Sequence, residues 1–481
     1  MSLENSLIAI VPISIIIITS LLVLLLDVFL KREDKNYLAF ISLAGLMLSG
    51  AVAFSVWNKN LTYFKQDLIL DNFSLFFFFF FLVSTALVIL SSMKYILLQK
   101  MNYGEFYTLL LLSLSGIMII TSSMDLLVIL LGLEVLAISS YVLAGIKRED
   151  VRSSEAAIKY FLLGGLASAF LIYGLALLYG ASNSTQITNI VHSLTINSNF
   201  SLLALTGFGL LIIGFCFKIA LVPFHIWTPD VYHGSPTPVA AFFSVGPKAA
   251  GFAVFIRIFT LFWPIRINQK AIFLALWIIA LLTITVGNLV ALRQKNIKRI
   301  LAYSSIAHAG YMLIAILSQD NQGLLFYLIA YLFMNLGAFA AIIAMSKKGE
   351  EYLELEDYAG IGFKYPWLGG TLAVFLFSLA GFPPTAGFLA KFYIFSSAVR
   401  NNLISLTMIG IIGSLISVFY YLRIVVYMYM KSPIKETIID IENPPLFLVL
   451  FICLLGVFQL GIFPGNILYW INQAISSLGI F

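Results

Sequence analysis

The sequence predicts an all-α membrane protein with about 14 transmembrane helices. Of its 481 residues, 61% are hydrophobic and only 10% are charged, and the mean hydropathy is +1.01. A soluble domain carries about 25% charged residues. The chain also supplies apolar runs of the roughly 20 residues that a membrane-spanning helix needs, one after another along most of its length. These observations together exclude a soluble enzyme.

The expected spans follow from these runs and the loops between them. In order they are 5–30, 36–57, 72–93, 105–122, 124–145, 155–180, 201–222, 236–262, 271–292, 300–318, 321–346, 366–399, 401–430 and 444–470. The first is expected to be retained, because no basic segment of a signal peptide precedes it. The span 366–399 is too long for one straight helix. The segment GFPPTAGF, 381–388, is expected to break it into two half-helices.

The basic residues predict the orientation. With the N-terminus outside, the inner loops hold 17 Lys and Arg residues and the outer loops hold five. This bias places both termini on the outer side, which requires an even number of spans. It also accounts for the pI of about 9.0 without nucleic-acid binding. Lys159 and Arg257 lie toward span ends and are expected to reach the interface. The charged segment 347–360 is expected to be a solvated inner loop.

The stretch from Gly214 to Gly251 is the most unusual part of the chain. It is apolar enough for a membrane, yet it contains Lys218, Lys248, two histidines (His225 and His233) and five prolines. Prolines break helices, and broken helices at membrane depth occur only where protein or water satisfies the freed backbone groups. Lysines buried beside such breaks are typical of an ion or proton pathway.

Three more polar residues within spans complete the candidate site. Glu134 is the clearest carboxylate in the middle of a span, whereas Asp125, nine residues earlier, is expected to cap that helix. Lys391 follows the break at 381–388, and His308 lies in the segment AYSSIAHAGYML. Histidine suits a relay because its unperturbed pKa is close to physiological pH.

These positions also suggest an internal repeat. Glu134 and His308 are 174 residues apart, Lys218 and Lys391 are 173 apart, and Lys248 and Arg423 are 175 apart. The offset equals five helices, and an odd number of spans inverts the second copy. The prediction is two inverted five-helix repeats, helices 4–8 and 9–13, with broken helices 7 and 12. The corresponding segments are residues 1–100, 105–262, 271–430 and 431–481.

Burial disfavours the charged form of an acid or a base, so buried groups of this kind can exchange protons near neutral pH. We expect a Glu134–Lys218 ion pair to switch the site. Lys248 would receive the charge, His308 and water would carry it across, and Lys391 would release it. The alternative for each residue is a structural role: an ion-pair partner, a packed cation or a hydrogen-bonded core histidine. Arg423 stays charged and is expected to act structurally or electrostatically.

Several kinds of site are unsupported. The two cysteines, Cys216 and Cys453, form no CxxC motif, so neither an iron–sulfur cluster nor a zinc site is expected. No phosphate-binding GxxxxGK[ST] and no dinucleotide-binding GxGxxG fingerprint is found. This chain alone is therefore not expected to bind NADH, hydrolyse ATP or carry electrons.

Four segments resemble one family. They are DLLVILLGLEVLAISSYVLAG, FKIALVPFHIWTPDVYHGSPTPVAAFFSVGPKAAGF, RILAYSSIAHAGYMLI and SLAGFPPTAGFLAKFYIF. Together they are similar to the antiporter-like subunits of respiratory complex I, the proton-pumping NADH:quinone oxidoreductase, and most of all to its bacterial N subunit. The resemblance covers nearly the whole chain from the fourth span onward. One departure is His233, where an acidic residue is expected.

The resemblance implies a proton channel in which Glu134, Lys218, Lys248, His308 and Lys391 match the family's relay positions. A lysine at 391 fits the N subunit, whereas the M-type relative carries a glutamate there. It further implies a multi-pass protein of the bacterial inner membrane, bound to other complex I membrane subunits, including M-type and small ones. NADH, FMN, iron–sulfur clusters and quinone are expected on other subunits, with no cofactor on this chain.

Two other functions remain open at this point. The chain is also similar to subunits of multi-subunit cation/proton antiporters, which exchange Na⁺ or K⁺ for protons without redox partners. A scaffold that keeps the fold but no longer transports is a third reading. The retained Glu134, Lys218, Lys248 and Lys391 argue against the scaffold.

Overall fold

The computed structural model describes residues 10–30, 35–63, 67–196, 202–262, 269–347, 349, 351–433 and 443–479. The chain is helical almost throughout these ranges. A single two-stranded antiparallel sheet, β1 (Leu61–Tyr63) and β2 (Leu68–Leu70), pairs Leu61 with Leu70 within the described residues. The start of the predicted first span and several basic residues used for the orientation, such as Lys31, Arg266 and Lys435, lie outside the described residues.

The helices have the following bounds. They are α2 (Val11–Phe29), α3 (Asn36–Ser55), α4 (Asn72–Leu98), α5 (Glu105–Thr121), α6 (Leu126–Ala144), α7 (Val151–Ser182), α8 (Ile187–Ile196), α9 (Leu202–Lys218), α10 (Trp227–Gly234), α11 (Thr237–Phe262), α12 (Gln269–Ala291), α13 (Ile297–Leu317), α14 (Asn321–Ala344), α15 (Ile361–Lys364), α16 (Pro366–Ala380), α17 (Ala386–Arg400), α18 (Ile404–Met430), α19 (Pro444–Ile462) and α20 (Gly465–Ser476), with short 3₁₀ turns η3 (Leu355–Tyr358) and η4 (Ser477–Gly479).

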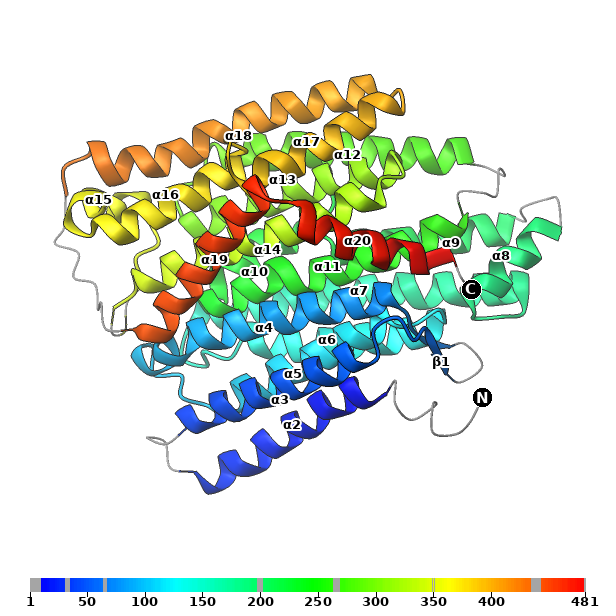
Figure 1. Cartoon of the computed structure of the whole chain (residues 1–481), viewed down its shortest axis with the longest axis horizontal. Coiled ribbons are helices and arrows are strands. Elements are labelled where there is room, and N and C mark those ends of the chain that lie inside the picture. The colour runs from blue at the N-terminus through cyan, green and yellow to red at the C-terminus, as the bar shows by residue number, and fades with distance from the viewer. Residues whose placement is uncertain are drawn as a thin grey trace.

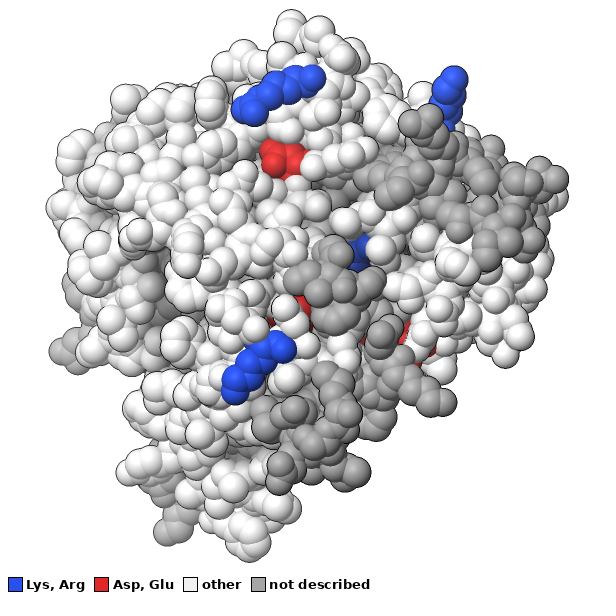
Figure 2. All heavy atoms as spheres, turned by 45° about the vertical axis from the view of Figure 1, so that its right-hand side comes forward, with Lys and Arg blue, Asp and Glu red and all other residues white. Residues whose placement is uncertain are grey.

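The predicted all-helical membrane architecture is confirmed. Among the described residues, eleven helices are long and apolar enough to cross a membrane, and α5, α9 and α16 are shorter apolar helices. The long helices run side by side along one direction, and the start of α2 and the end of α20 lie at the same end of the bundle (Figure 1). The face shown in Figure 2 carries only a few separate Lys, Arg, Asp and Glu side chains among the residues drawn in colour or white. A surface with so few charges suits an apolar surrounding.

The centre of the bundle is formed by α11, α13 and α14. The most apolar 18-residue stretches of α11, α13 and α14 are 100%, 94% and 94% buried, whereas that of α2 is 28% buried. Helices buried on all sides are normally apolar on all sides. These three instead contain Lys248, His308 and Asn335, each 2% exposed or less. Polar groups placed at the most buried position of the fold require partners, and those partners define the site described below.

Both predicted helix breaks are present. Helix α9 ends at Lys218, and α10 begins only at Trp227. Helix α16 ends at Ala380 and is capped by Gly381, which has φ +93°, a conformation that favours glycine. The Gly381 N–H donates to the carbonyls of Phe377 and Ser378. Helix α17 then starts at Ala386. Asp125 caps α6 as predicted, because its carboxylate accepts from the N–H groups of Leu127 and Val128.

Two sequence predictions are wrong. Arg257 does not reach the interface: it is 4% exposed and forms a buried ion pair with Asp71 at 2.8 Å, with its guanidinium over the Phe73 ring. The segment 347–360 is not simply solvated. Glu351 turns inward and accepts hydrogen bonds from Tyr95 and Thr237. In both cases a partner distant in sequence supplies the opposite charge or the hydrogen bond, and span position alone does not reveal it.

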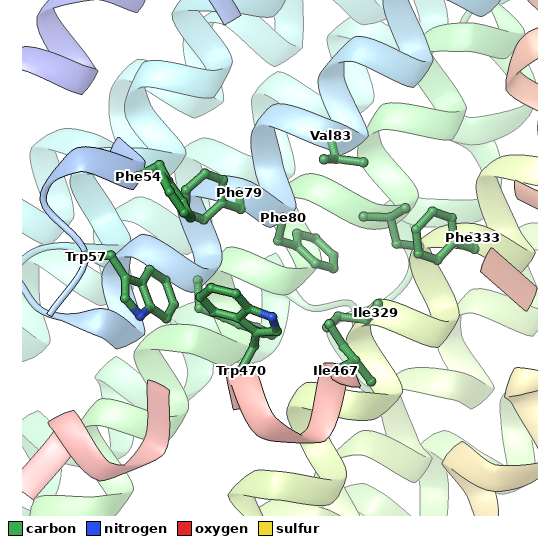
Figure 3. A pocket seen from close by; sticks show the side chains of 11 residues that line it. Phe54, Trp57, Phe79, Phe80, Val83, Ile329, Phe333, Ile467 and Trp470 are labelled. Carbon is green, nitrogen blue, oxygen red and sulfur yellow. The ribbon is translucent and has the colours of Figure 1, made fainter. Parts of the chain in front are cut away.

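A wholly apolar cavity of about 340 Å³ lies apart from these polar groups. Side chains of α3, α4, α14 and α20 line it, including Phe79, Phe333 and Trp470 (Figure 3). Trp57 packs edge-on against Trp470, with ring centroids 5.0 Å apart, and its indole N–H donates to Gln473 at 2.9 Å. None of the lining residues titrates, so the cavity is not the candidate site.

Candidate functional site

Lys248 joins two central helices. Its Nζ on α11 donates to the backbone carbonyl of Ser305 on α13 at 2.6 Å, and also to the Ser305 hydroxyl. The residue before it is Pro247, which has no N–H to donate within the helix. Only 2% of Lys248 is exposed. The ammonium is therefore held by neutral oxygens, and among the described residues no ion pair neutralises it.

His308 lies in a cage of tyrosines on α13, α14 and α18. Its Nδ1 and the Tyr327 hydroxyl are 2.6 Å apart, and its Nε2 and the Tyr421 hydroxyl are 3.3 Å apart. The Tyr421 hydroxyl also bonds to that of Ser304, next to Ser305. The ring of Tyr331 packs against the imidazole at 5.2 Å. Both ring nitrogens thus have a hydroxyl partner, which is the arrangement through which an imidazole can pass a proton.

Lys391 occupies the second helix break. Its Nζ donates to the carbonyls of Leu379 and Ala380, at 3.0 and 2.9 Å, and to Ser414 Oγ at 2.8 Å. These carbonyls belong to the last turn of α16, where a helix leaves acceptors unsatisfied and its dipole favours a cation. Breaking the span at Gly381 therefore creates the binding site for the ammonium. The same Nζ lies 5.3 Å from the Tyr311 ring centroid.

Tyrosines and serines lie between the central histidine and the two lysines. Tyr421 contacts both His308 and Ser304, the neighbour of the Ser305 that holds Lys248. Tyr311, whose ring is 5.7 Å from His308 and which faces Lys391, accepts a hydrogen bond from Asn288 at 3.0 Å. Lys248, His308 and Lys391 thus lie on neighbouring helices with Ser304, Ser305, Tyr421 and Tyr311 between them.

Lys218 and Glu134 form the other end of the site. Lys218 is 5% exposed and is the last residue of α9. The expected close ion pair is absent from the part of the chain that the structure describes. The half-buried Glu134 carboxylate instead accepts a short hydrogen bond from Ser168 on α7. The break after Lys218 packs on α11, because a Cβ at Gly251 would lie only 2.3 Å from Ile219 Cγ2.

Arg423 does not repeat the role of Lys248. Its guanidinium donates to the carbonyls of Leu292, at 2.8 Å, and Gln294, just beyond the end of α12. This is the structural role predicted for a cation that cannot titrate. His225 lies two residues before α10, and His233 lies in the last turn of that helix. Both are half-buried.

Sequence reasoning missed the neutral members of the site: Ser304, Ser305, Tyr311, Tyr327, Tyr331, Tyr421 and Ser414. Serine and tyrosine are common in membrane helices and carry no charge that marks them. One signal was available. Tyr327 and Tyr331 are four residues apart, so they share a helix face.

Known proteins resemble this chain over almost its full length. The family model described as NADH:quinone oxidoreductase/Mrp antiporter, TM, matches residues 123–417. NADH-quinone oxidoreductase subunit N of Trichlorobacter lovleyi is 45% identical over 473 residues, which are 98% of this chain and 97% of the relative.

Two solved structures share the fold. A chain of respiratory complex I from Thermus thermophilus with bound Aureothin superimposes with a TM-score of 0.80 at 34% identity, covering 95% of this chain and 98% of that one. A chain of the Mrp complex from Dietzia sp. DQ12-45-1b gives a TM-score of 0.82 over 99% and 98% of the two chains. Its identity is only 18%, so this likeness shows the fold alone.

Proposed function

Because this chain belongs to the family of NADH-quinone oxidoreductase subunit N, the proton-translocating membrane subunit of complex I, we propose that Glu134, Lys218, Lys248, His308 and Lys391 carry the translocated proton. The observation that supports this most is the burial of three lysines and a histidine, each at most 5% exposed, along one polar region. Lone charges inside a membrane protein are costly and mark ion pathways.

The transfer begins at the first break. When Glu134 approaches Lys218, their attraction keeps the ammonium protonated; when they separate, burial favours its release. The arrangement with Glu134 bonded to Ser168 corresponds to the separated state. The packing of Ile219 against α11 sets Lys218 beside the helix that bears Lys248. The charge therefore has a second buried amine to move to.

The middle of the path is built from hydroxyls. Lys248 bonds to Ser305, and the adjacent Ser304 bonds to Tyr421, which contacts His308. On the other ring nitrogen, Tyr327 continues the chain. A hydroxyl donates one proton and accepts another, so it relays a proton without becoming charged for long. Water completes the steps that these side chains do not bridge, and Lys391 releases the proton toward the outer side.

We also infer fourteen membrane crossings, formed by the eleven long helices, by α5 and α9, and by the half-helices α16 and α17 together, with both termini outside in a bacterial inner membrane. Matching caps support the inverted repeats. Asp125 and Asn296 cap α6 and α13, and Asp150 and Asp320 cap α7 and α14, at offsets of 171 and 170 residues. NADH, FMN, iron–sulfur clusters and quinone are assigned to other subunits of the complex.

The antiporter reading is the second candidate, since the matched family model names both groups and the Dietzia chain shares the fold. The 45% identity to a subunit N over nearly the entire chain favours the oxidoreductase. A transport assay separates the two readings. Proton movement driven by NADH without Na⁺ or K⁺ supports the first, and a strict need for either cation supports the second.

The relay is tested with Lys218→Ala and Glu134→Ala in the assembled complex. NADH-driven proton pumping is expected to fall in both variants while the complex still assembles. Thr206→Ala, an exposed position on α9, is a matched control that is expected to pump normally. Pumping and quinone reduction at the unmodified level in both test variants would exclude the relay.

A further inference from the structure

The apolar cavity between α3, α4, α14 and α20 has no part in the proposed proton path. Its eleven lining residues are all Phe, Trp, Val, Ile or Leu, and the rings of Phe80, Phe333 and Trp470 surround one shared space (Figure 3). A lining of this kind supplies no side-chain acceptor to water or to a polar ligand, whereas it suits a hydrocarbon. Its volume of about 340 Å³ falls within the range of small-molecule sites, about 300–1,000 Å³.

The cavity is open to the surroundings of the bundle. Phe54, Val83 and Trp470 line it and are large hydrophobic side chains with exposed surface. The ring of Phe333 is held from behind by α19, because a Cβ at Gly456 would lie only 2.5 Å from Phe333 Cγ. In a membrane, lipid chains surround such an opening. A chain that enters makes the dispersion contacts that an empty cavity lacks.

The mouth of the cavity lies at the end of the bundle where α2 starts and α20 ends. Trp57 is located there, between α3 and β1 (Figure 1). Its indole N–H donates to Gln473 at 2.9 Å, and the Gln473 amide donates to the Tyr469 hydroxyl at 2.8 Å. Tryptophan and tyrosine that present a polar group in this way are typical of the membrane–water interface. The mouth is therefore expected at the level of the lipid headgroups.

The depth of the cavity matches one leaflet. On α4 the lining extends to Val83, eleven residues after the helix begins at Asn72. Eleven residues of a helix rise about 16 Å, and half of the hydrocarbon core of a bilayer is about 15 Å thick. The cavity thus runs from the headgroup level toward the middle of the membrane, as an acyl chain does.

A cation lies beside the mouth. Lys59 follows Trp57 by two residues and is exposed, and among the described residues no carboxylate pairs with it. The turn that carries Lys59 is fixed to the start of α4, because Asn58 and Asn72 exchange two hydrogen bonds, at 2.7 and 2.8 Å. A lysine at the membrane surface attracts the phosphate of a lipid headgroup.

We propose that the cavity binds one acyl chain of a phospholipid from the leaflet on the side of the two termini, and that Lys59 binds the phosphate of the same lipid. A partner helix does not fit, because one turn of a helix about 10 Å wide fills about 420 Å³. The isoprenoid tail of a quinone carries no charge for Lys59 to attract. The bound chain would pack on α14, whose Tyr327 and Tyr331 contact His308.

The test places the assembled complex in bilayer discs that contain a phospholipid with a photoreactive acyl chain. After illumination, mass spectrometry is expected to find cross-links within residues 76–83, 329–333 and 467–470. Val83→Trp fills the cavity and is expected to remove most of these cross-links. Val142→Trp is the matched control, because Val142 is an exposed valine on α6 that does not line the cavity, and it is expected to leave them unchanged.

Lys59 is tested with the same probe. Lys59→Gln is expected to lower the cross-linking about fivefold, which corresponds to about 1 kcal/mol per basic residue at a membrane surface. Lys59→Arg keeps the charge and is expected to retain the cross-links. A photoreactive chain on an uncharged alcohol, which has no phosphate, is expected to label the cavity weakly. Equally strong labelling by this second probe, or undiminished labelling of Lys59→Gln, would overturn the phosphate site.

A map of the unmodified complex in the same discs provides an independent measurement, which decides the question if Val83→Trp does not assemble. Chain-shaped density between Phe80, Phe333 and Trp470 is expected, with headgroup density next to Lys59. An empty cavity, or one filled by a side chain of a neighbouring subunit, would overturn the lipid site. So would cross-links that persist in Val83→Trp.

Discussion

Gly381→Ala tests whether the second helix break exists to hold Lys391. The glycine has φ +93°, and an L-residue in the left-handed region costs about 1–2 kcal/mol. A Cβ there would also lie 3.1 Å from Lys391 Cδ, which is closer than nine in ten real Cβ contacts. The lysine stem must move by a few tenths of an ångström, which disturbs its bonds to the Leu379 and Ala380 carbonyls. Both stability and function should therefore suffer.

The assay compares Gly381→Ala with Gly370→Ala in the purified complex, by thermal inactivation and by NADH-driven proton pumping. Gly370 lies in the same helix, and a Cβ there would meet no atom of the described residues within 4 Å. Replacing it is expected to be neutral or to stabilise by about 0.5–1 kcal/mol. Gly381→Ala is expected to lower the inactivation temperature and slow pumping. Equal behaviour of the two variants in both measurements would refute the link between the break and the lysine.

Two further predictions concern buried charges outside the relay. Arg257→Met leaves Asp71 buried without its partner and is expected to destabilise the complex by about 3–5 kcal/mol, measured by thermal inactivation. The control is Lys147→Met, which removes a partly exposed ion pair with Asp150 and is expected to cost at most about 1 kcal/mol. Equal losses of stability in the two variants would contradict the structural role of the buried Arg257–Asp71 pair. Glu351→Gln is expected to flatten the acid dependence of stability. Because the pKa of Glu351 is below its usual 4.5, its contribution is present above that pH and is lost as the pH falls through the folded-state pKa. A variant that loses stability in acid as steeply as the unmodified protein would contradict it.

The apolar runs were sufficient to predict the helices because each span must satisfy its own backbone within the membrane. Gly381 and the prolines after it likewise located the second break, and the prolines from Pro223 onward located the first. Composition and local chemistry decide these features, and both are visible in the sequence.

Pairing between distant segments was harder to predict. Arg257 lies at the end of a predicted span, but its ion-pair partner, Asp71, precedes it by 186 residues in the chain. Glu351 belongs to a charged segment that looks solvated until Thr237 and Tyr95 are brought against it. The tyrosine cage of His308 joins three helices, so no local spacing encodes it.

Proton pumping by Lys248→Arg is the most direct measurement of whether the buried lysines release their protons. An arginine keeps the positive charge and can still donate to Ser305, but it does not deprotonate in proteins. The assembled variant is expected to lose NADH-driven pumping, while Lys159→Arg, in a partly exposed ion pair with Asp230, is expected to keep it. Full pumping by Lys248→Arg would show that this site needs only a fixed charge, and would contradict proton release by Lys248.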